Sequence, residues 1–565
     1  MGSPQPDQQL AITTARTVLG TLIQAGIRDL VISPGSRSAP LAYAAAEAEH
    51  AGLLRIHVRI DERSAAFMAL GLAQSTATPV ALAATSGTAI GQMLPAVMEA
   101  NHTATPLLVL SADRPDELHG TGASQSTKQK TLFSDHVRLA LNVPAGQQPG
   151  ACLEQALLAL QGDAHLPGGP VQLNLQFRDP LTPADNESIS NPYWAHITPG
   201  TWPVARAEQQ AAPAPATKSL PPRRTVVVAG HDAGPQAQEF AYQLGLPLFA
   251  EPSSNARFSD HAITHYRPLI SVGIEHIERV VLFGRPTLSR PVARLMADPS
   301  IASAIWQPAP VAWYEAGRRR ETPIGNWQEQ QEFAGRAPAG WLAAWQELDA
   351  QALELRTDID RNTSINGLLV AEAIWEHQPE VLLLGSSNIV RDFDLAARPS
   401  DGIAVHANRG LAGIDGTIST ALGLAVGSQR RTVAVMGDIT FAHDASSLSW
   451  TPGEKKPELD VVVYNDGGGA IFSTLEHGAV ADSGRYANAV ERLFSTPQDF
   501  DIQSLAKAYG WEYERADSKE ELGSLLGHRG GAALRLIEVC ASRDHLRADN
   551  QSLNEKIGQL SWPGQ

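Results

Sequence analysis

Two segments of the chain, 432–438 (TVAVMGD) and 460–467 (DVVVYNDG), decide the fold. Each begins as a short run of β-branched and apolar residues, which is typical of a buried strand, and each ends in a carboxylate or amide beside glycine. One crossover of helix length, from residue 443 onward, lies between them, so we expect two neighbouring parallel strands. Asp438 and Asn465 would then lie together at the carboxyl edge of a sheet, where open α/β sheets bind their ligands.

The side chains at this edge are suited to a hard cation. The Asp438 carboxylate, the Asn465 amide oxygen and the backbone carbonyl of Gly467 form an oxygen-only set that Mg²⁺ prefers, with its other positions left for water and phosphate oxygens. Asp, Asn and Gly are also common in ordinary turns after strands. The residues alone therefore leave both interpretations open, a metal site and two simple turns.

Strand-like and helical segments alternate through most of the chain, which predicts an α/β fold of three doubly wound parallel-sheet domains. We expect an N-terminal domain at 1–190, a central domain with flanking linkers at 191–355 and a C-terminal domain at 356–565. Pro and Ala dominate residues 191–222, which favours an extended linker. The first and third domains have the same pattern. Strands are expected at 29–33, 55–60, 80–84, 106–110, 225–230, 279–283, 381–384, 403–406, 432–436, 460–464 and 534–539.

Composition excludes several functional classes. The 565 residues include 44 basic and 60 acidic side chains, and a net charge of −16 provides no basic field for nucleic acid or an anionic membrane. Two cysteines exclude a disulfide framework and a cysteine zinc site. No apolar run approaches the length of a membrane span, and the first residues lack a targeting pattern. We expect a cytoplasmic protein without membrane insertion.

The Gly-Asp and Asn pattern resembles the diphosphate-binding signature of thiamine diphosphate (ThDP) enzymes. Further motifs lie at 31–41 (VISPGSRSAPL), 61–63 (DER), 112–118 (ADRPDEL), 122–125 (GASQ), 408–416 (NRGLAGIDG) and 437–444 (GDITFAHD). These motifs resemble those of one family of ThDP enzymes, the 2-succinyl-5-enolpyruvyl-6-hydroxy-3-cyclohexene-1-carboxylate (SEPHCHC) synthases of menaquinone biosynthesis. The resemblance implies a transferase that decarboxylates 2-oxoglutarate and adds the succinyl carbanion equivalent to isochorismate in a 1,4-addition. It implies ThDP and Mg²⁺ as cofactors, with Mn²⁺ as an alternative ion.

Glu62 follows an expected strand and begins an expected helix. An acidic residue there also complements the helix dipole without any catalytic role. The resemblance implies that Glu62 is the catalytic carboxylate, bonded to the aminopyrimidine ring of the cofactor, and that Asp438, Asn465 and the Gly467 carbonyl hold the metal. It also implies a set of residues that bind the cofactor: Glu62, Ser387, Gly413, Ile414, Gly437, Asp438 and Asn465. Ile414 could equally be an ordinary core residue.

A protein of charge −16 needs local cations to hold substrates that carry several carboxylates, and arginine suits a carboxylate best. Arginines stand in glycine and serine loops after the expected strands, although a single one is usually a solvated surface charge. The resemblance implies two groups of substrate contacts. Ser387, Arg391 and Arg409 would bind the adduct derived from 2-oxoglutarate; Ser36, Arg37 and Gln125 would contact isochorismate, with Arg290 adding a cation and Ile471 and Phe472 walling the pocket.

The family pairs its first and third domains between chains, so we expect a homodimer or a dimer of dimers with the active site between subunits.

Three alternatives to this function remain open from the sequence. The chain could be another ThDP-dependent 2-oxo acid decarboxylase or an acetolactate-type synthase. It could be a non-catalytic subunit of ThDP fold, although such a subunit needs neither Glu62 nor the metal residues. A flavin oxidoreductase that uses the central domain is the weakest of the three.

Overall fold

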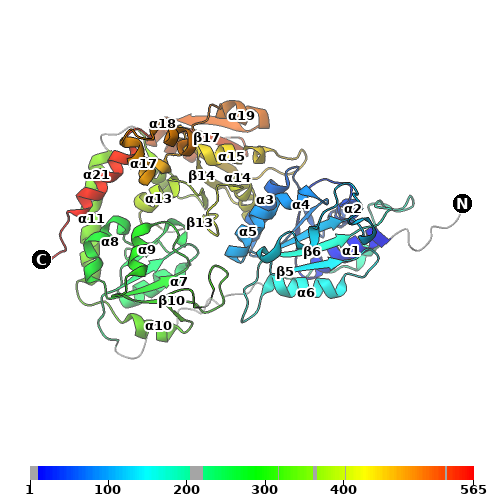
Figure 1. Ribbon diagram of the computed structural model, residues 1–565, viewed down its shortest axis with the longest axis horizontal. Coiled ribbons are helices and arrows are strands. Elements are labelled where there is room, and N and C mark those ends of the chain that lie inside the picture. The colour runs from blue at the N-terminus through cyan, green and yellow to red at the C-terminus, as the bar shows by residue number, and fades with distance from the viewer. Residues whose placement is uncertain are drawn as a thin grey trace.

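The computed structural model describes residues 10–203, 220–315, 317–360, 365–400, 402–528 and 531–564. The chain forms three sheets in which every strand pair is parallel, with helices interleaved between the strands (Figure 1). This confirms the predicted α/β fold with three parallel-sheet units. The initial residues 1–9 and half of the expected linker, 204–219, lie outside the described residues.

The first sheet has six strands in the order β2-β1-β3-β4-β6-β5. Its strands are β1 (Asp29–Ile32), β2 (Arg55–Val58), β3 (Val80–Ala84), β4 (Leu107–Asp113), β5 (Leu139–Val143) and β6 (Val171–Gln176). The helices around it are α1 (Leu10–Gln24), α2 (Ala39–His50), α3 (Glu62–Thr76), α4 (Thr88–Gln92), α5 (Leu94–Thr103) and α6 (Gly150–Gln161). The predicted strands of this domain are confirmed.

Strands β5 and β6 were not expected because amide residues interrupt their apolar runs. All six residues of β6 are nevertheless buried. The NH2 groups of its amides find partners on neighbouring segments: Gln172 Nε2 donates to Ser111 Oγ at 3.0 Å, and Asn174 Nδ2 donates to Asp113 Oδ2 at 2.9 Å. A buried polar group is tolerated where it is hydrogen-bonded, and those partners are remote in sequence.

The central sheet has five strands in the order β11-β10-β9-β7-β8. The expected strands at 225–230 and 279–283 are β7 and β9, and three further strands complete the sheet. The strands are β7 (Thr225–Ala229), β8 (Leu248–Ala250), β9 (Arg279–Phe283), β10 (Ala302–Trp306) and β11 (Thr322–Ile324). The helices are α7 (Pro235–Leu244), α8 (Tyr266–Gly273), α9 (Arg290–Ala297), α10 (Trp327–Ala334) and α11 (Trp341–Asp360).

The third sheet has six strands in the order β13-β12-β14-β15-β17-β16, which is the topology of the first sheet repeated. The strands are β12 (Val381–Leu384), β13 (Ala404–His406), β14 (Thr432–Gly437), β15 (Leu459–Asn465), β16 (Glu512–Ala516) and β17 (Leu534–Cys540). The helices are α12 (Gly367–His377), α13 (Ile389–Ala396), α14 (Thr417–Ser428), α15 (Asp438–His443), α16 (Ile471–Thr474), α17 (Glu476–Asp482), α18 (Ala487–Val490), α19 (Ile502–Tyr509), α20 (Lys519–Gly527) and α21 (Leu546–Gly558).

The crossover between β14 and β15 differs from the expected one. Its α-helix, α15, begins at Asp438 itself and ends at His443, and a 3₁₀ helix follows at Ala445–Leu448. The segment from 449 to 458 then leads to β15 without further helix. Asp438 is thus the first residue of a helix rather than part of a free loop.

The first and third domains pack together through α3 and α14, which lie side by side. Glycines allow the close approach: a Cβ on Gly71 would lie 2.2 Å from the Thr420 carbonyl oxygen, and one on Gly423 would lie 2.2 Å from the Met68 carbonyl oxygen. Ser419 Oγ donates to Ser64 Oγ at 3.1 Å across the same contact. The two domains therefore form a tight helix pair within one chain.

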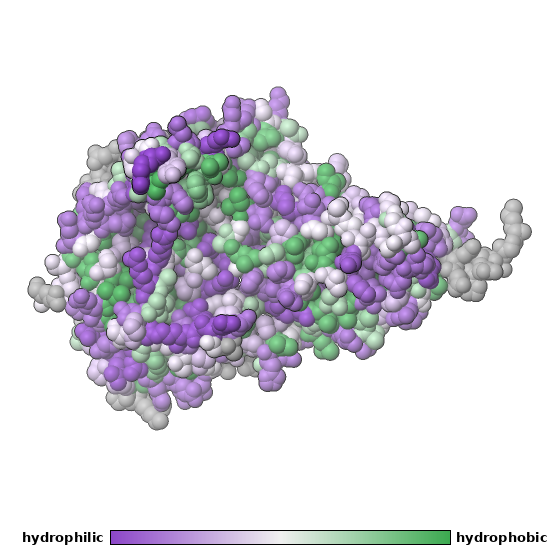
Figure 2. Space-filling view, viewed as in Figure 1, coloured by the Kyte–Doolittle hydropathy of each residue, from purple (hydrophilic) through white to green (hydrophobic). Residues whose placement is uncertain are grey.

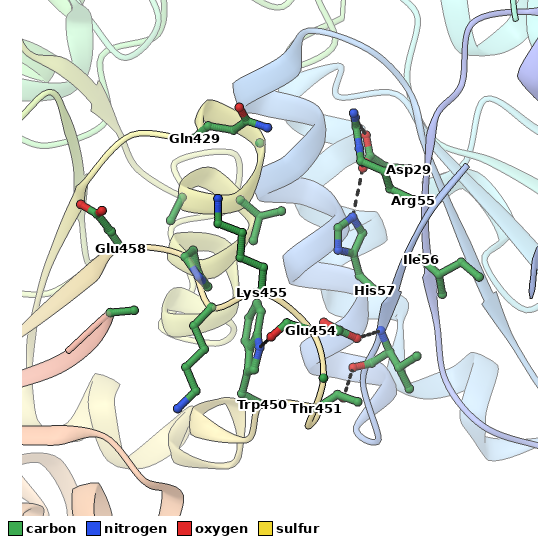
Figure 3. A pocket seen from close by; sticks show the side chains of 18 of the residues that line it. Asp29, Arg55, Ile56, His57, Gln429, Trp450, Thr451, Glu454, Lys455 and Glu458 are labelled. Atoms are coloured by element: carbon green, nitrogen blue, oxygen red, sulfur yellow. Dashed lines mark hydrogen bonds and ion pairs between the residues drawn. The ribbon is translucent and has the colours of Figure 1, made fainter. Parts of the chain in front are cut away.

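A second contact between these domains is drawn in Figure 3. The segment before β15 lies along β2, where Glu454 Oε1 accepts from the Val58 amide at 2.7 Å and Thr451 Oγ1 donates to the Val58 carbonyl at 2.8 Å. The buried Arg59 pairs with Glu454 at 2.9 Å and stacks on Trp450. A cavity of about 700 Å³ lies beside this contact. The residues that line it include none of the predicted site residues.

The end of the chain returns to the central domain. Helix α21 packs against α8 and α11, beside which it lies at the left of Figure 1. Trp562 stacks on His276 with ring centroids 4.3 Å apart and contacts Trp341 and Trp345. The predicted domain boundary at 355 falls inside α11. Residues on both sides of that position therefore share the core of the central domain.

Candidate functional site

The carboxyl edge of the third sheet brings the predicted metal residues together. β14 and β15 are neighbours, with Gly437 opposite Tyr464, so Asp438 and Asn465 follow at the same edge. Asp438 Oδ1 accepts from the Ile439 amide at 2.8 Å. The Asn465 amide is oriented by its neighbours, since Nδ2 donates to Glu538 Oε1 at 2.7 Å and Oδ1 accepts from the Gly467 amide at 3.3 Å.

Two buried carboxyl groups meet at this edge. Asp438 is 4% exposed and Asp466 is 7% exposed. Burial raises the pKa of the Asp438 carboxyl. Burial, together with the nearby Asp438 and Asp392, raises the pKa of Asp466 to about 8. Carboxyl groups crowded in this way favour either a bound proton or a bound cation.

Ser387 lies beside the same edge, in the turn after β12. Its hydroxyl is buried and has no hydrogen-bond partner among the described residues. A Cβ on Gly437 would lie 3.6 Å from Ser387 Oγ, so the missing side chain of Gly437 keeps the space in front of this hydroxyl open. A buried hydroxyl without a partner is costly unless a ligand satisfies it.

Two of the predicted arginines adjoin this group. Arg391 Nη1 donates to the Ser387 carbonyl at 2.9 Å. Arg409 is 4% exposed and donates through Nη1 to Ser386 Oγ at 3.4 Å. Burial lowers the pKa of both guanidinium groups, although arginine remains charged. The edge thus combines buried carboxylates with buried cations.

The loop between β13 and α14 carries the predicted cofactor residues Gly413 and Ile414. Ile414 is half-buried, and its carbonyl accepts from Thr417 Oγ1 at 3.0 Å in the first turn of α14. A Cβ on Gly413 would lie 2.3 Å from Asp415 Oδ1. A larger residue at 413 would therefore require the Asp415 side chain to move.

The predicted pocket wall lies on short helices after β15. Ile471 and Phe472 begin α16 and are half-buried, and the Phe472 ring packs on Phe494 with centroids 5.6 Å apart. Arg290, the first residue of α9, is exposed and pairs with Glu476 at 3.0 Å. This pair connects the central domain to α17, directly after the predicted wall.

Glu62 occupies the first position of α3 at the carboxyl edge of the first sheet. Asp61 caps the helix by accepting from the Arg63 and Ser64 amides, and Glu62 itself is half-buried. Its neighbours are tied to the third domain: Arg63 pairs with Asp444 at 2.6 Å, and Ser446 Oγ donates to Asp61 Oδ2 at 2.8 Å. The cap of α3 therefore uses the Asp61 carboxylate and not the Glu62 carboxylate.

The remaining predicted residues gather at the same edge of the first sheet. Arg37 Nη1 donates to the Phe177 carbonyl at 2.8 Å, and Ser36 beside it is exposed. Gln125 is exposed and adopts φ +54° close to Gly87. Arg114 donates to Ser86 Oγ at 2.9 Å in this cluster. Burial and, to a smaller extent, the charge of Arg114 lower the pKa of Arg37, while the nearby Asp179 opposes this shift.

Each sheet edge therefore holds its own group of predicted residues. Within one chain, and for the residues the structure describes, no hydrogen bond or ion pair joins Glu62, Arg37 or Gln125 to Asp438, Arg391 or Arg409. Figure 2 shows apolar patches at several places on one face, including near its middle, among hydrophilic residues. Large apolar side chains beside predicted site residues are exposed, among them Ile60 at 71% and Leu411 at 45%.

Two family models and several curated relatives match this chain. Residues 12–132 match the N-terminal and residues 392–531 the C-terminal TPP-binding domain of thiamine pyrophosphate enzymes. A SEPHCHC synthase of Paenarthrobacter aurescens (strain TC1) is 52% identical over 98% of this chain and 97% of its own length. The chain belongs to the SEPHCHC synthase family. Synthases of Arthrobacter sp. (strain FB24) and Renibacterium salmoninarum are 51% and 50% identical over 98% and 95% of this chain, and cover 93% and 95% of their own lengths.

SEPHCHC synthases are thiamine diphosphate enzymes, and the third-sheet edge fits that cofactor. Among the described residues the Ser387 hydroxyl lacks a partner, Gly437 leaves the adjacent space open, and the Asp438 carboxyl is buried. Among the described residues, no three His, Cys, Asp or Glu side chains cluster as a metal site. A metal here would accordingly need amide, carbonyl and diphosphate oxygens as well as Asp438.

Several residues of this site were missed by the sequence analysis. Glu538 orients Asn465 from β17, and a charged residue inside the apolar run LRLIEV was the available signal. Asp392 is buried beside Asn388, and burial raises its pKa to about 7. Glu99 and Thr287 contact the loop at 409–411 from other domains. No local pattern marks those two, because their role depends on tertiary contacts.

In the described part of the chain, no helix is both long and apolar enough to cross a bilayer.

Proposed function

We propose that this chain decarboxylates 2-oxoglutarate and adds the succinyl unit to isochorismate in a 1,4-addition, with ThDP and Mg²⁺ bound, to give SEPHCHC in menaquinone biosynthesis. One observation supports this function best. The third-sheet edge combines oxygen ligands at the buried Asp438 and the half-buried Asn465 with the buried cation of Arg409, a set that suits both a metal diphosphate and a dicarboxylate. The names of the relatives support the same reaction.

The proposed cofactor site lies at the third-sheet edge. Asp438, the Asn465 amide oxygen and the Gly467 carbonyl hold Mg²⁺, with Mn²⁺ as an alternative ion, and the orientation of Asn465 by Glu538 supports this set. Ser387 and Gly437 contact the cofactor at the opening between β12 and β14, and Gly413 and Ile414 contact it from the loop before α14. When bound, ThDP supplies the nucleophilic carbon and the electron sink for decarboxylation.

Glu62 is the proposed catalytic carboxylate. It exchanges a proton with the aminopyrimidine ring of the cofactor, for which a carboxyl group in an apolar surrounding is suited. Its place at the start of α3, next to the exposed Ile60, supports contact with a second subunit. The Asp61 cap leaves the Glu62 carboxylate unused for helix structure.

The substrates are proposed to bind through two sets of cations. Arg391, Arg409 and Ser387 hold the carboxylates derived from 2-oxoglutarate, and the two arginines lose part of their hydration on burial, which strengthens their bonds to an anion. Ser36, Arg37 and Gln125 contact isochorismate from the first sheet. Arg290 adds a cation, and Ile471 and Phe472 exclude water beside the reacting carbon.

We further propose a cytoplasmic homodimer or dimer of dimers in which the first domain (1–190) of one chain faces the third domain (356–565) of another, with the central domain (191–355) between them in sequence. The separation of the two predicted groups within one chain supports an active site completed by a partner subunit. Exposed apolar side chains beside both groups, Ile60 and Leu411, support burial at that contact.

The first test is an omission experiment. The protein is mixed with ThDP, Mg²⁺, 2-oxoglutarate and isochorismate, the absorbance of isochorismate is followed, and each component is left out in turn. Loss of isochorismate that requires all four is the expected result. Release of CO₂ at the full rate without isochorismate would instead indicate a different acceptor, and neither reaction would favour a non-catalytic subunit.

A further inference from the structure

The loop at 409–416 has to keep a fixed shape if its residues are to bind both a substrate and a cofactor. It carries Arg409, Gly413 and Ile414 and lies between the short strand β13 and α14. Ala412 within it adopts φ +59°, a left-handed conformation that is uncommon for residues other than glycine. Such a loop has few bonds of its own, so contacts from outside determine its shape.

The first domain supplies one such contact through Glu99 of α5. Its two carboxylate oxygens accept from the Gly410 and Leu411 amides, each at 2.6 Å. Glu99 is only 3% exposed, and a Cβ on Gly410 would lie 2.8 Å from the Glu99 backbone carbonyl oxygen and 2.9 Å from the carboxylate. Glycine at 410 is therefore required for the carboxylate to reach both amides. Bonds from backbone amides to a buried carboxylate are among the stronger ones in proteins.

The central domain supplies the second contact, on the Arg409 side chain. Arg409 Nε donates to Thr287 Oγ1 at 2.9 Å, and Nη2 donates to the Thr287 carbonyl at 2.8 Å. The Thr287 amide in turn donates to Glu251 Oε1 at 2.8 Å. A guanidinium has five N–H groups, so the two bonds to Thr287 leave further N–H groups on Nη1 and Nη2 for a carboxylate.

A third contact ties the same loop to the central domain. Arg285 Nη1 donates to the Gly410 carbonyl at 2.6 Å. The peptide groups around Gly410 are thus bonded on one side to the first domain and on the other to the central domain, while the loop itself belongs to the third. All three domains meet on residues 409–411.

We propose that Glu99 and Thr287 are positioning residues: Glu99 fixes the backbone of the loop, and Thr287 fixes the Arg409 guanidinium for the carboxylate of the 2-oxo acid. Neither side chain needs to touch the substrate or the cofactor. This proposal rests on the proposed function. It assigns the central domain a part in binding the 2-oxo acid, exerted through Arg409.

Thr287 allows a matched pair of variants. Thr287→Val keeps the size and branching of the side chain and removes the hydroxyl, whereas Thr287→Ser keeps the hydroxyl. We expect Thr287→Val to raise the KM for 2-oxoglutarate about 10-fold, because the Arg409 Nε bond is lost. The Kd of ThDP, measured by titration calorimetry with Mg²⁺, should stay within about twofold. Thr287→Ser should restore the KM.

Glu99→Gln probes the backbone contact, since the two backbone amides donate to different oxygens of Glu99 and the NH2 group of glutamine would face one of these donors without being able to accept. We expect this variant to raise the Kd of ThDP and the KM for 2-oxoglutarate, each about 10-fold, because Gly413 and Ile414 lie on the same loop as Arg409. Hydrogen exchange of the peptide covering residues 409–416 should become faster in the free protein. Glu99→Asp, which keeps the charge, serves where Glu99→Gln does not fold.

The outcomes separate this proposal from the function on which it rests. A wild-type protein that binds no ThDP or consumes no 2-oxoglutarate would end both proposals. A wild-type protein that does both, with a Thr287→Val variant of unchanged KM, would overturn the positioning role alone. Failure of Thr287→Ser to restore the KM, or equal loss of ThDP affinity in Thr287→Val, would also overturn it, because either result indicates a general structural defect.

Discussion

At the carboxyl edge of the third sheet Asp438, Asp466 and Arg409 are buried, whereas at the same edge of the first sheet Ser36 and Gln125 are exposed. The two sheets have one topology, with the strand order of the first repeated in the third. The difference therefore does not come from the fold. It comes from what covers each edge.

Position by position, the two edges carry different chemistry. The turn after β1 presents Ser36 and Arg37, and the matching turn after β12 presents Ser386 and Ser387. The helix after β3 begins at the neutral Thr88, whereas the helix after the equivalent strand β14 begins at Asp438. One edge thus offers the half-buried cation of Arg37 beside exposed polar groups, and the other offers buried carboxylates. Two copies of one architecture can in this way supply complementary halves of a site.

The covering of the third edge explains its burial. Thr287 and Arg285 of the central domain contact the loop at 409–411, and Glu99 of the first domain contacts it from the other side. At the first edge, Asp444 and Ser446 of the third domain contact only the start of α3, through Arg63 and Asp61, and Ser36 and Gln125 stay exposed in the described part of the chain. An edge that stays open in one chain is available to a partner chain, which is the basis of the proposed dimeric site.

The largest expected effect belongs to the open edge. Glu62→Gln should lower kcat by about 100- to 10,000-fold, the range for loss of a positioned acid or base. Because Glu62 caps nothing and the helix start is held by Asp61, thermal stability should stay unchanged. Steady-state turnover in the four-component assay measures the effect, and Glu154→Gln on the exposed face of α6 is the matched control. Near wild-type turnover would remove Glu62 from the mechanism.

The next effect tests the buried edge. Asp438→Asn should weaken Mg²⁺ and ThDP binding by about 100-fold or more, since even an indirect supporter of a metal ligand contributes 10- to 100-fold in affinity. Calorimetric titration of Mg²⁺ in the presence of ThDP measures this change. Asp517→Asn, which removes an exposed ion pair with Arg515, is the control. If both variants bind Mg²⁺ equally, the metal lies elsewhere.

A pair of arginine variants tests whether the edges serve different substrates. Arg37→Ala should raise the KM for isochorismate about 10- to 100-fold and leave that for 2-oxoglutarate nearly unchanged, because a charge-assisted hydrogen bond contributes about 1.5–3 kcal/mol. Arg391→Ala should show the opposite pattern. The two KM values are measured by varying one substrate at saturation of the other. Equal effects of both variants on both substrates would contradict the division between the edges.

The sequence alone was sufficient to predict those site residues that directly follow a strand with a clear β-branched and apolar pattern. The runs before Asp438 and Asn465 are β-branched and apolar, so the strands and their shared edge could be predicted. The amide-bearing β6 could not, because its burial depends on partners such as Ser111. The helix at Asp438–His443 was missed because six residues are too few for a helical period.

The supports of the site show a second limit. Glu99 and Thr287 lie in segments with no glycine motif, and each acts on a loop remote from it in sequence. Their importance follows only from two tertiary contacts: the Glu99 carboxylate accepts from two backbone amides, and Thr287 accepts from the Arg409 guanidinium. Residues that touch ligands sit at predictable strand ends, whereas residues that hold them are placed by packing between domains.

The smallest effect concerns the opposite edge of the first sheet, where we expect stability rather than function. Asp29 at the start of β1 accepts two bonds from Arg55, at 2.8 and 2.5 Å, and lies 3.0 Å from His57 Nε2 (Figure 3). Burial alone would raise the pKa of Asp29, but the bonds from Arg55 and His57 outweigh it and hold the pKa at about 2. The folded state therefore favours the ionised carboxylate.

Asp29→Asn should lower the free energy of unfolding by about 2 kcal/mol at pH 7, and leave kcat and both KM values unchanged. A carboxyl group with a lowered pKa stabilises the folded protein above its unfolded pKa of about 4, and this stabilisation is lost as the pH falls toward 2. The difference between wild type and variant in urea midpoints should hence be constant from pH 8 to 5 and narrow below about pH 4. A difference that grows on acidification, or a changed KM, would contradict the assignment of this edge to stability, because the sign of the pH dependence follows from the ionised state of Asp29 alone.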